Sequence, residues 1–252
     1  MKCPKCQYER TSHDQHVVPG ICPACGIAYT KWKNNANTAS VQRHSDEIDQ
    51  DYTFTQKLWG TLTYVPDKVD ATAFWGRAAL LAIFVVWGFN FILHGVDWTH
   101  IGASFLHNVN LPFHEFGHVL FSPFGRFMMF LGGSLFQIMM PLIALFSFSL
   151  QMRDNFAAAI MLWWTGQNFI DVAPYIADAK YRALPLIRGM GEESHDWGNL
   201  LTMLNREESA QTYGDISFTI GALIMLLSFY WAGWILYQQK KILDEFGDSR
   251  GR

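Results

Sequence analysis

Charged residues are scarce in this chain and unevenly placed. They make up 16% of its 252 residues, whereas charged residues usually account for about 25% of a soluble domain. Half of all residues are hydrophobic. Residues 1–73 are polar, but most of 75–238 is apolar and aromatic. This composition excludes an ordinary soluble domain for the larger part of the chain and is typical of a membrane protein.

Cysteines and basic stretches are missing from most of the chain. All four cysteines precede residue 26, so the apolar part cannot contain disulfide bonds. There is no basic stripe, and the formal net charge of −3 gives no reason to expect a nucleic-acid partner. The first long apolar run is not preceded by the combination that marks a signal peptide, which is a charged segment, a short apolar segment and a cleavage site of small residues. We therefore expect no cleaved signal peptide.

Five long apolar runs follow the polar N-terminal part. Each comes close to the roughly 20 residues that cross a bilayer as a helix. They cover 75–94, 101–123, 127–149, 155–177 and 215–237. Aromatic residues near several of their ends favour membrane spans over the buried helices of a soluble protein. We predict an all-α polytopic membrane protein with about five transmembrane helices and a small N-terminal zinc ribbon.

The zinc ribbon is predicted from two C-P-x-C pairs in the pattern C-x2-C-x15-C-x2-C. The four cysteines are Cys3, Cys6, Cys22 and Cys25. Four thiolates at tetrahedral spacing suit Zn²⁺ in a closed structural site, whereas two disulfides are the alternative. Because so small a piece buries little core, metal binding would supply most of its folding energy. The stretch resembles a rubredoxin-like zinc ribbon.

The predicted organisation has four parts. The zinc ribbon covers residues 1–33, and a polar linker with an interfacial lead-in covers 34–74. The transmembrane domain covers 75–238 and includes a polar loop at 178–213 that we expect in the cytoplasm. A polar tail follows at 239–252.

The distribution of lysine and arginine predicts an orientation. Lys68 and Arg77 flank the start of the first span, and residues 95–100 after it contain neither residue type. This places the N-terminal ribbon in the cytoplasm, a reducing compartment that suits thiolate ligands. Five alternating spans then put the C-terminal tail outside. The tail begins with Lys240 and Lys241, which conflicts with that placement.

The second apolar run contains the motif HEFGH. On a helix, His114 and His118 are four residues apart and share one face, so both imidazoles can bind one metal ion. Glu115 lies next to the first histidine and can act as a general base on a water molecule that zinc activates. Ionisable groups inside a membrane are costly and by default mark a functional site. The motif therefore predicts a catalytic zinc site.

Two histidines leave this site one protein ligand short of a catalytic set. Asp171 is preferred, because it lies about as deep in the fourth apolar run as His118 lies in the second. His195 and Asp196, in the polar loop, are alternatives that could fold up to the site. Asp178, seven residues after Asp171 on the same helix face, is a third alternative.

Asn168 is the other polar side chain near the preferred third ligand. It precedes Asp171 by one turn and shares its helix face. Its amide could hold a substrate backbone or an oxyanion, or it could bond to a neighbouring helix, and the spacing does not distinguish these roles.

The H-E-x-G-H form of the motif comprises His114, Glu115, Gly117 and His118. It resembles the site-2 protease class of intramembrane zinc metalloproteases, the M50-like group, over about residues 100–180. The resemblance implies that the histidines bind zinc, that Glu115 is the catalytic base and that a later helix supplies an aspartate ligand. It also implies an endopeptidase that cleaves in or near transmembrane segments, opens toward the cytoplasm and lies in the inner membrane if the source is bacterial.

The expected cofactors are two zinc ions, one catalytic and one structural. The expected partners are a membrane-protein substrate, the lipid bilayer and a protein recruited by the zinc ribbon. The alternative function is a non-proteolytic metal-binding membrane regulator or chaperone that retains the HExGH site. Full zinc occupancy with no substrate trapped by a Glu115→Gln variant would favour that alternative.

Overall fold

A computed structural model gives the fold of most of the chain. It describes residues 2–12, 14, 17–29, 53–184 and 194–249. The chain divides into two compact units, Met1–Leu58 and Trp59–Arg252. Regular structure in the described residues is helical, apart from two isolated antiparallel bridges, Lys2–Glu9 and Ile21–Ala28. The prediction of an all-α architecture is therefore confirmed for these residues.

The N-terminal unit contains two similar turns, one around each pair of cysteines. The N–H of Gln7 donates to the carbonyl of Cys3 at 3.0 Å, and the N–H of Gly26 donates to that of Cys22 at 2.9 Å. Gln7 and Gly26 also share positive φ angles of 61° and 70°. This left-handed backbone reverses the chain after each pair of cysteines, so the two knuckles have the same local structure.

The helices follow one another with short connections. In chain order they are α2 (Phe54–Leu62), α3 (Ala71–His94), α4 (Trp98–Gly102), α5 (Phe105–Phe121), α6 (Arg126–Phe146), α7 (Asn155–Ala177), α8 (Asp196–Leu204) and α9 (Ala210–Ser249). Asp70, Ser104 and Asp154 cap α3, α5 and α7, because their side chains accept hydrogen bonds from N–H groups of the first turn. A π-helical turn, Ser147–Gln151, extends α6.

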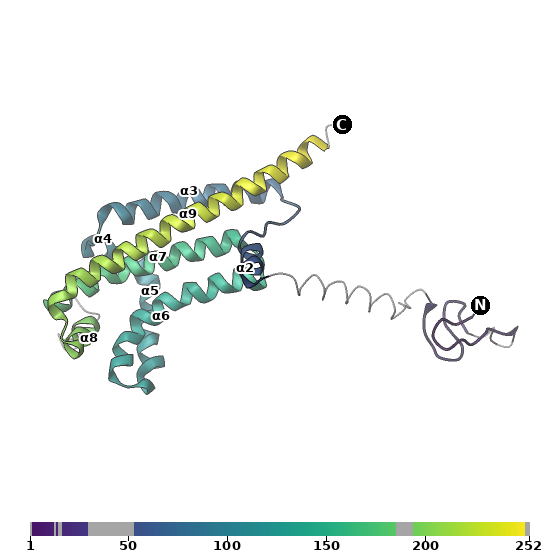
Figure 1. Cartoon of the computed structure of the whole chain (residues 1–252), viewed down its shortest axis with the longest axis horizontal. Helices are drawn as coiled ribbons and strands as arrows, with labels where there is room; N and C mark the ends of the chain where they lie inside the picture. Colours follow the sequence, from purple (N-terminus) through teal and green to yellow (C-terminus); the bar gives the residue numbers. More distant parts are fainter. Residues whose placement is uncertain (1, 13, 15–16, 30–52, 185–193, 250–252) are drawn as a thin grey trace. The chain divides into compact units, whose positions relative to one another are not determined.

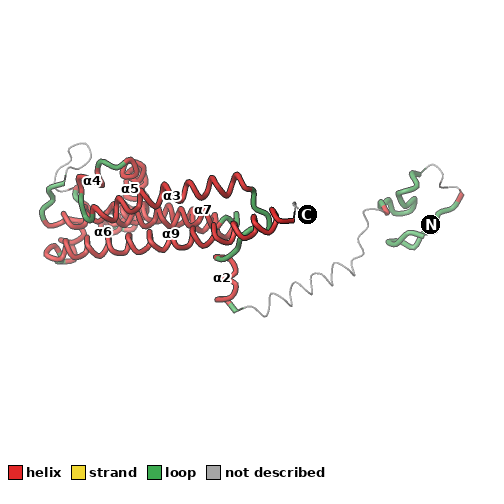
Figure 2. Tube along the Cα trace, turned by 90° about the horizontal axis from the view of Figure 1, so that it is seen from above, coloured by secondary structure: helices red, strands yellow, loops and turns green. Residues whose placement is uncertain are grey.

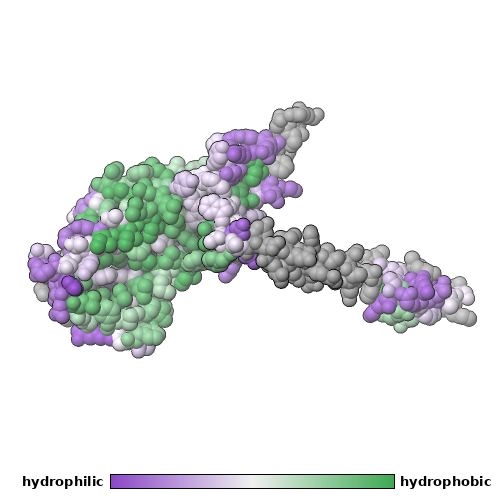
Figure 3. All heavy atoms as spheres, viewed as in Figure 1, coloured by the Kyte–Doolittle hydropathy of each residue, from purple (hydrophilic) through white to green (hydrophobic). Residues whose placement is uncertain are grey.

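Three helical segments of the described chain are long and apolar enough to cross a membrane. They are Ala71–His94, Arg126–Gln151 and Glu207–Glu245. On the face shown in Figure 3, apolar residues gather over the helical unit and polar residues lie toward its ends. These features are consistent with a membrane protein. Four of the predicted spans are continuous helical segments, and 101–123 is interrupted between α4 and α5. The count of five membrane crossings and the cytoplasmic side of the ribbon stay predictions.

The contacts of α3 give its direction relative to α7 and α9. Near the start of α3, Phe74 belongs to one apolar cluster with Phe156 of α7 and Ile235 of α9. Near its end, Gly88 lies against Trp163 of α7 and Met225 of α9. The helix α3 is therefore parallel to α7 and antiparallel to α9.

The direction of α6 differs from the predicted alternation of five spans. Gln137 contacts Asp171 and Ser149 contacts Asn155, so α6 is antiparallel to α7 and hence to α3. Strict alternation would make α3 and α6 parallel, and this prediction is wrong. The reason is that α5, with 17 residues, is only about 26 Å long and lies across the other helices (Figures 1 and 2). The start of α3 and the end of α9 thus share one end of the bundle, which removes the conflict raised by the basic C-terminal tail. The end of α7 and the start of α9, which bound the loop at 178–213, lie at the other end. The cytoplasmic side predicted for this loop therefore disagrees with a cytoplasmic N-terminal ribbon.

Glycines allow two pairs of helices to approach closely. A Cβ on Gly166 of α7 would lie 2.7 Å from the carbonyl oxygen of Gly221 in α9, and one on Gly221 would lie 2.5 Å from that of Gly166. Gly117 of α5 and Gly132 of α6 face each other in the same way. Such contacts between small residues are typical of membrane helices. The contact between Gly117 and Gly132 holds the HEFGH helix against α6.

Candidate metal centre

Three donor atoms converge beside the C-terminal half of α5. His114 Nε2 and His118 Nε2 lie 3.0 and 3.2 Å from Asp196 Oδ2. The donor atoms of this group all lie within 4.8 Å of one another. Ligands bound at about 2.0–2.1 Å to a tetrahedral zinc ion are ~3.3–3.4 Å apart. His114, His118 and Asp196 could therefore hold one metal ion.

The second nitrogen of each imidazole faces a hydrogen-bond acceptor. His114 Nδ1 lies 3.1 Å from Gln137 Oε1, and His118 Nδ1 lies 2.7 Å from the carbonyl oxygen of Met129. An acceptor at Nδ1 keeps the proton there and leaves the Nε2 lone pair free for a metal. Metal-ligating histidines are generally oriented in this way.

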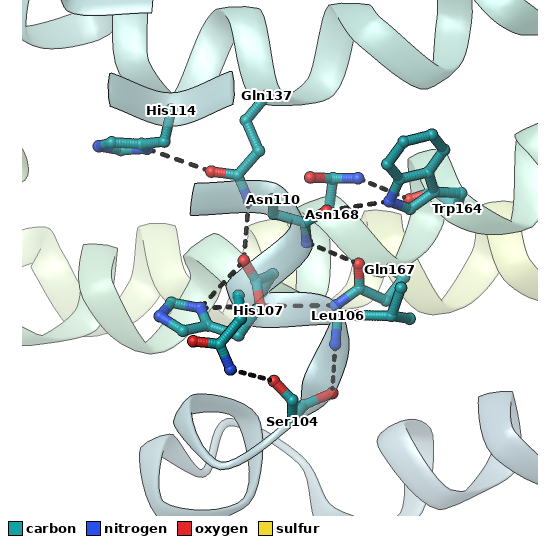
Figure 4. A network of polar contacts seen from close by, with 11 residues as sticks. Ser104, Leu106, His107, Asn110, His114, Gln137, Trp164, Gln167 and Asn168 are labelled. Atoms are coloured by element: carbon teal, nitrogen blue, oxygen red, sulfur yellow. Dashed lines mark hydrogen bonds and ion pairs between the residues drawn. The ribbon is translucent and has the colours of Figure 1, made fainter. Parts of the chain in front are cut away.

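Gln137 separates the ligand cluster from Asp171. Its Nε2 donates to Asp171 Oδ2 at 2.8 Å, and Asp171 Oδ1 lies 3.2 Å from Nδ1 of His107. Figure 4 shows His114 and His107 at opposite ends of this network. The geometry thus differs from the prediction of Asp171 as the third ligand. Asp196, one of the alternatives, occupies that position, and Asp171 supports His114 through Gln137.

Asp196 is the first residue of α8 and is fixed by its neighbours. The Tyr175 hydroxyl donates to Asp196 Oδ2 at 3.2 Å and accepts from the Asp196 N–H at 2.8 Å. His195 caps α8, because its Nδ1 accepts from the Gly198 N–H at 3.0 Å, while its Nε2 donates to Asp178 Oδ2 at 3.2 Å. With both ring nitrogens engaged, His195 positions the loop, and Asp178 holds His195.

Glu115 differs from the ligands in its exposure. His114 and Asp196 are buried, whereas Glu115 is exposed. Glu115 directly follows His114 and precedes His118 by three residues on α5, so it lies near the cluster. A carboxylate in this position is accessible to a water molecule or a substrate.

Asn168 is not brought to the three ligands. Its Nδ2 donates to the carbonyl of Trp164 at 2.9 Å, and its fully buried Oδ1 has no partner in the described part of the chain. Nearby, Trp164 Nε1 donates to Asn110, and Asn110 donates to Gln167 (Figure 4). A substrate contact for Asn168 stays a prediction.

The four thiols of the N-terminal unit also converge. The distance from Cys3 Sγ to Cys25 Sγ is 3.7 Å and that from Cys6 Sγ to Cys22 Sγ is 3.6 Å. Thiolates bound at about 2.3 Å to a tetrahedral zinc ion are ~3.8 Å apart, whereas sulfur atoms in a disulfide are about 2.05 Å apart. All four cysteines are free. The cluster could hold a metal ion and is compatible with a zinc ribbon.

Backbone donors favour the thiolate form of Cys22. Burial opposes ionisation, but the N–H groups of Cys25 and Ala24, together with the thiols of Cys3 and Cys25, lower the pKa of the Cys22 thiol to about 6, while the pKa of the Cys6 thiol in the same cluster is raised to about 12. Metal ions bind the thiolate, so Cys22 is largely in its binding form at neutral pH.

Two residues that support the ligands were absent from the sequence candidates. Gln137 is a polar residue in an otherwise apolar run, and that contrast is a signal that could have marked it. Tyr175 holds Asp196, but nothing in its spacing connects it with a loop residue 21 positions later. Only the fold brings these two together.

Gly133 of α6 leaves the space that the two imidazoles occupy. A Cβ at this position would lie 2.6 Å from His114 Nε2 and 2.7 Å from His118 Nε2. We expect Gly133→Ala to weaken metal binding at this centre by about 10- to 100-fold, the range seen when groups around a metal ligand are disturbed. Competition with a chromogenic chelator measures the affinity.

The matched control for this variant is Gly76→Ala. Gly76 also lies within a helix, and no other group lies within 4 Å of a Cβ added there. Both substitutions favour the helical backbone equally, so only contact with the imidazoles distinguishes them. Equal metal affinities of the two variants would contradict the position assigned to Gly133.

The geometry of the site indicates its chemistry more directly than the motif does. The donor set and the orientation of its imidazoles come from described residues, whereas the resemblance to the site-2 protease class comes from the H-E-x-G-H motif alone. Searches among known proteins found no family model, no curated protein and no solved structure that matches this chain.

Proposed function

We propose that this protein is an intramembrane zinc endopeptidase. The observation that carries the proposal is the convergence of His114 Nε2 and His118 Nε2 on Asp196 Oδ2. Two imidazoles and one carboxylate are a common donor set of catalytic zinc in hydrolases, and three protein ligands leave one position open. Glu115 follows the first ligand directly, which is where a metalloprotease carries its general base.

The residues around the site have distinct roles in this mechanism. Zinc held by such a set acts as a Lewis acid on a carbonyl group and lowers the pKa of water to about 7. Glu115 would accept a proton from the attacking water and deliver it to the amide nitrogen as the peptide C–N bond breaks. Tyr175 and Gln137 would keep Asp196 and His114 in place through their hydrogen bonds.

The surroundings of the site favour a membrane-embedded substrate. The HEFGH helix packs against Arg126–Gln151, a segment of membrane-spanning length and composition. A transmembrane helix hides its carbonyl groups in its own hydrogen bonds, so a substrate would have to unwind locally. The cysteine cluster would bind a second, structural zinc ion and recruit a substrate or partner protein. Because thiols stay reduced in the cytoplasm, the cysteine cluster would lie on the cytoplasmic side of the membrane. In a bacterial source this membrane would be the inner one.

Removal of the metal tests the proposal. The full chain is reconstituted in liposomes with a reporter whose transmembrane segment contains a glycine- and proline-rich stretch. Because zinc activates both the water and the carbonyl, we expect chelation to lower cleavage by at least about tenfold and added Zn²⁺ to restore it. The fragments are measured by mass spectrometry.

A variant with Cys22→Ser and Cys25→Ser separates the two metal sites in this assay. It lacks two ligands of the cysteine cluster and leaves the centre on α5 intact, so its residual cleavage should remain sensitive to the chelator. Cleavage that continues after measured loss of all metal would rule out the zinc mechanism. Full metal occupancy without cleavage of any reporter would favour the regulator or chaperone.

A further inference from the structure

A second polar site lies at the other end of the helical unit. It is a cavity of about 150 Å³ between α3, the α6–α7 turn, α7 and α9. Its polar lining consists mainly of Tyr64, Arg77, Arg153, Asp154, Asn155 and Gln239. On α7, Asn155 at the cavity and Tyr175 at the metal centre are 20 residues apart, or ~30 Å along the axis. That distance matches the thickness of the hydrocarbon layer, roughly 30 Å.

The cavity carries an excess of positive charge. Arg77 Nη2 donates to Asp154 Oδ2 at 2.8 Å, the one hydrogen bond found for this guanidinium in the described chain. The Arg153 guanidinium lies over the Tyr64 ring, 5.5 Å from its centroid, and has no hydrogen-bond partner among the described residues. The cavity lining thus contains two guanidinium groups and one carboxylate, and most of the guanidinium donors have no partner among the described residues. Such forked donors suit phosphate oxygens.

Arg153 has a backbone conformation that is unusual for its residue type. Its φ is +53°, in the left-handed region that residues other than glycine seldom adopt. It follows Met152, the C-cap of the turn that extends α6, and lines the cavity. Strained backbone of this kind persists where the surrounding structure enforces it and is concentrated at ligand sites.

Gln239 provides the independent indication of a ligand. Gln239 lines the cavity and is only 1% exposed, yet its Oε1 has no hydrogen-bond partner in the part of the chain that the structure describes. The neighbouring Asn155 is satisfied, because its Nδ2 donates to the carbonyls of Thr61 and Tyr64 at 2.7 and 3.0 Å. A buried acceptor without a donor costs free energy. A ligand that donates to Gln239 would remove that cost.

We propose that this cavity binds a phosphate group that carries a hydrogen-bond donor on a short arm, as in the headgroup of phosphatidylethanolamine. The phosphate would pair with Arg77 and Arg153, and the ammonium group would donate to Gln239 Oε1. Trp75 and Tyr237, on α3 and α9 near this end, are 65% and 58% exposed. Exposed aromatic side chains at helix ends are typical of the headgroup level. This site is independent of the proposed hydrolytic function.

Lipid retention tests the proposal in the full chain. The protein is placed in nanodiscs with equal amounts of phosphatidylethanolamine and phosphatidylcholine, and co-purifying lipid is measured by native mass spectrometry. The two headgroups share a phosphate and a positive charge, but the choline has no N–H donor. We expect about fivefold preferential retention of phosphatidylethanolamine, the worth of one hydrogen bond. Arg153→Gln should weaken retention of both lipids.

The Gln239→Met variant removes the acceptor with little change in volume, and Gln238→Met is its neighbour control. We expect loss of the preference in the first variant and its persistence in the second, with similar melting temperatures. No preference in the wild type, or an unchanged preference in Gln239→Met, would overturn the proposal. Soluble phosphoethanolamine added to delipidated protein shows whether the ligand is a lipid headgroup or a soluble ester. Binding of the soluble compound that depends on Gln239 assigns the site to a soluble ester. Binding of the lipid alone assigns it to a headgroup.

Discussion

The Asp196→Ala variant should contain one metal ion per chain where the wild type contains two. Asp196 Oδ2 lies within 3.2 Å of both imidazole Nε2 atoms of the HEFGH motif. Without it, two histidines remain, which is fewer than the three protein ligands of catalytic zinc sites. The cysteine cluster, in a separate unit of the chain, should keep its ion. Elemental analysis of the purified protein measures the ratio.

The informative comparison is Asp171→Asn, the aspartate preferred from sequence. Asp171 reaches His114 only through Gln137, so this variant should keep two ions at saturating zinc and bind one of them about 10- to 100-fold more weakly. Two ions retained in Asp196→Ala and one in Asp171→Asn would reverse the ligand assignment. Melting curves of both variants show whether either loss reflects unfolding.

Glu115→Gln should abolish proteolysis while leaving the metal in place. The substitution keeps the size of the side chain and removes the carboxylate that accepts the proton, a contribution of about 10²- to 10⁴-fold in rate. Because Glu115 is exposed and is not one of the three clustered donors, zinc content should stay at two ions per chain. The transmembrane reporter in liposomes measures cleavage.

Glu208→Gln is the matched control. Glu208 lies in the 3₁₀ turn before α9, where its carboxylate pairs with Lys180, so it shares the exposure of Glu115 but not its position. We expect this variant to cleave at the wild-type rate. Undiminished cleavage by Glu115→Gln would exclude Glu115 as the base, and loss of zinc from that variant would give it a structural role instead.

Local patterns predicted much of the fold, all four cysteines of one cluster and two of the three donors of the other. Helical periodicity fixes the relation of His114 to His118, and two C-x2-C pairs fix the local structure around their cysteines, so both followed from sequence spacing. Three of the five apolar runs, 75–94, 127–149 and 155–177, became helices with bounds close to those expected, whereas 101–123 is broken between α4 and α5 and 215–237 lies within the longer α9. These features depend on residues a few positions apart and need no tertiary information.

The third ligand could not be predicted in the same way. Asp196 reaches the histidines because Tyr175 and the cap of His195 fix the start of α8. Asp171 has a suitable depth, but the Gln137 side chain lies between it and His114. Equal depth in two helices does not specify which faces meet, since that depends on packing. The direction of α6 was missed for a related reason, because apolar length alone does not show that α5 lies across the bundle.

Anomalous diffraction at the zinc absorption edge, from crystals of the full chain, locates the metal directly. We expect two peaks per chain, one within the four-cysteine cluster and one bound by His114 Nε2, His118 Nε2 and the carboxylate of Asp196. A peak between His107 and Asp171, or no peak at the HEFGH helix in zinc-loaded protein, would contradict the assignment of this centre.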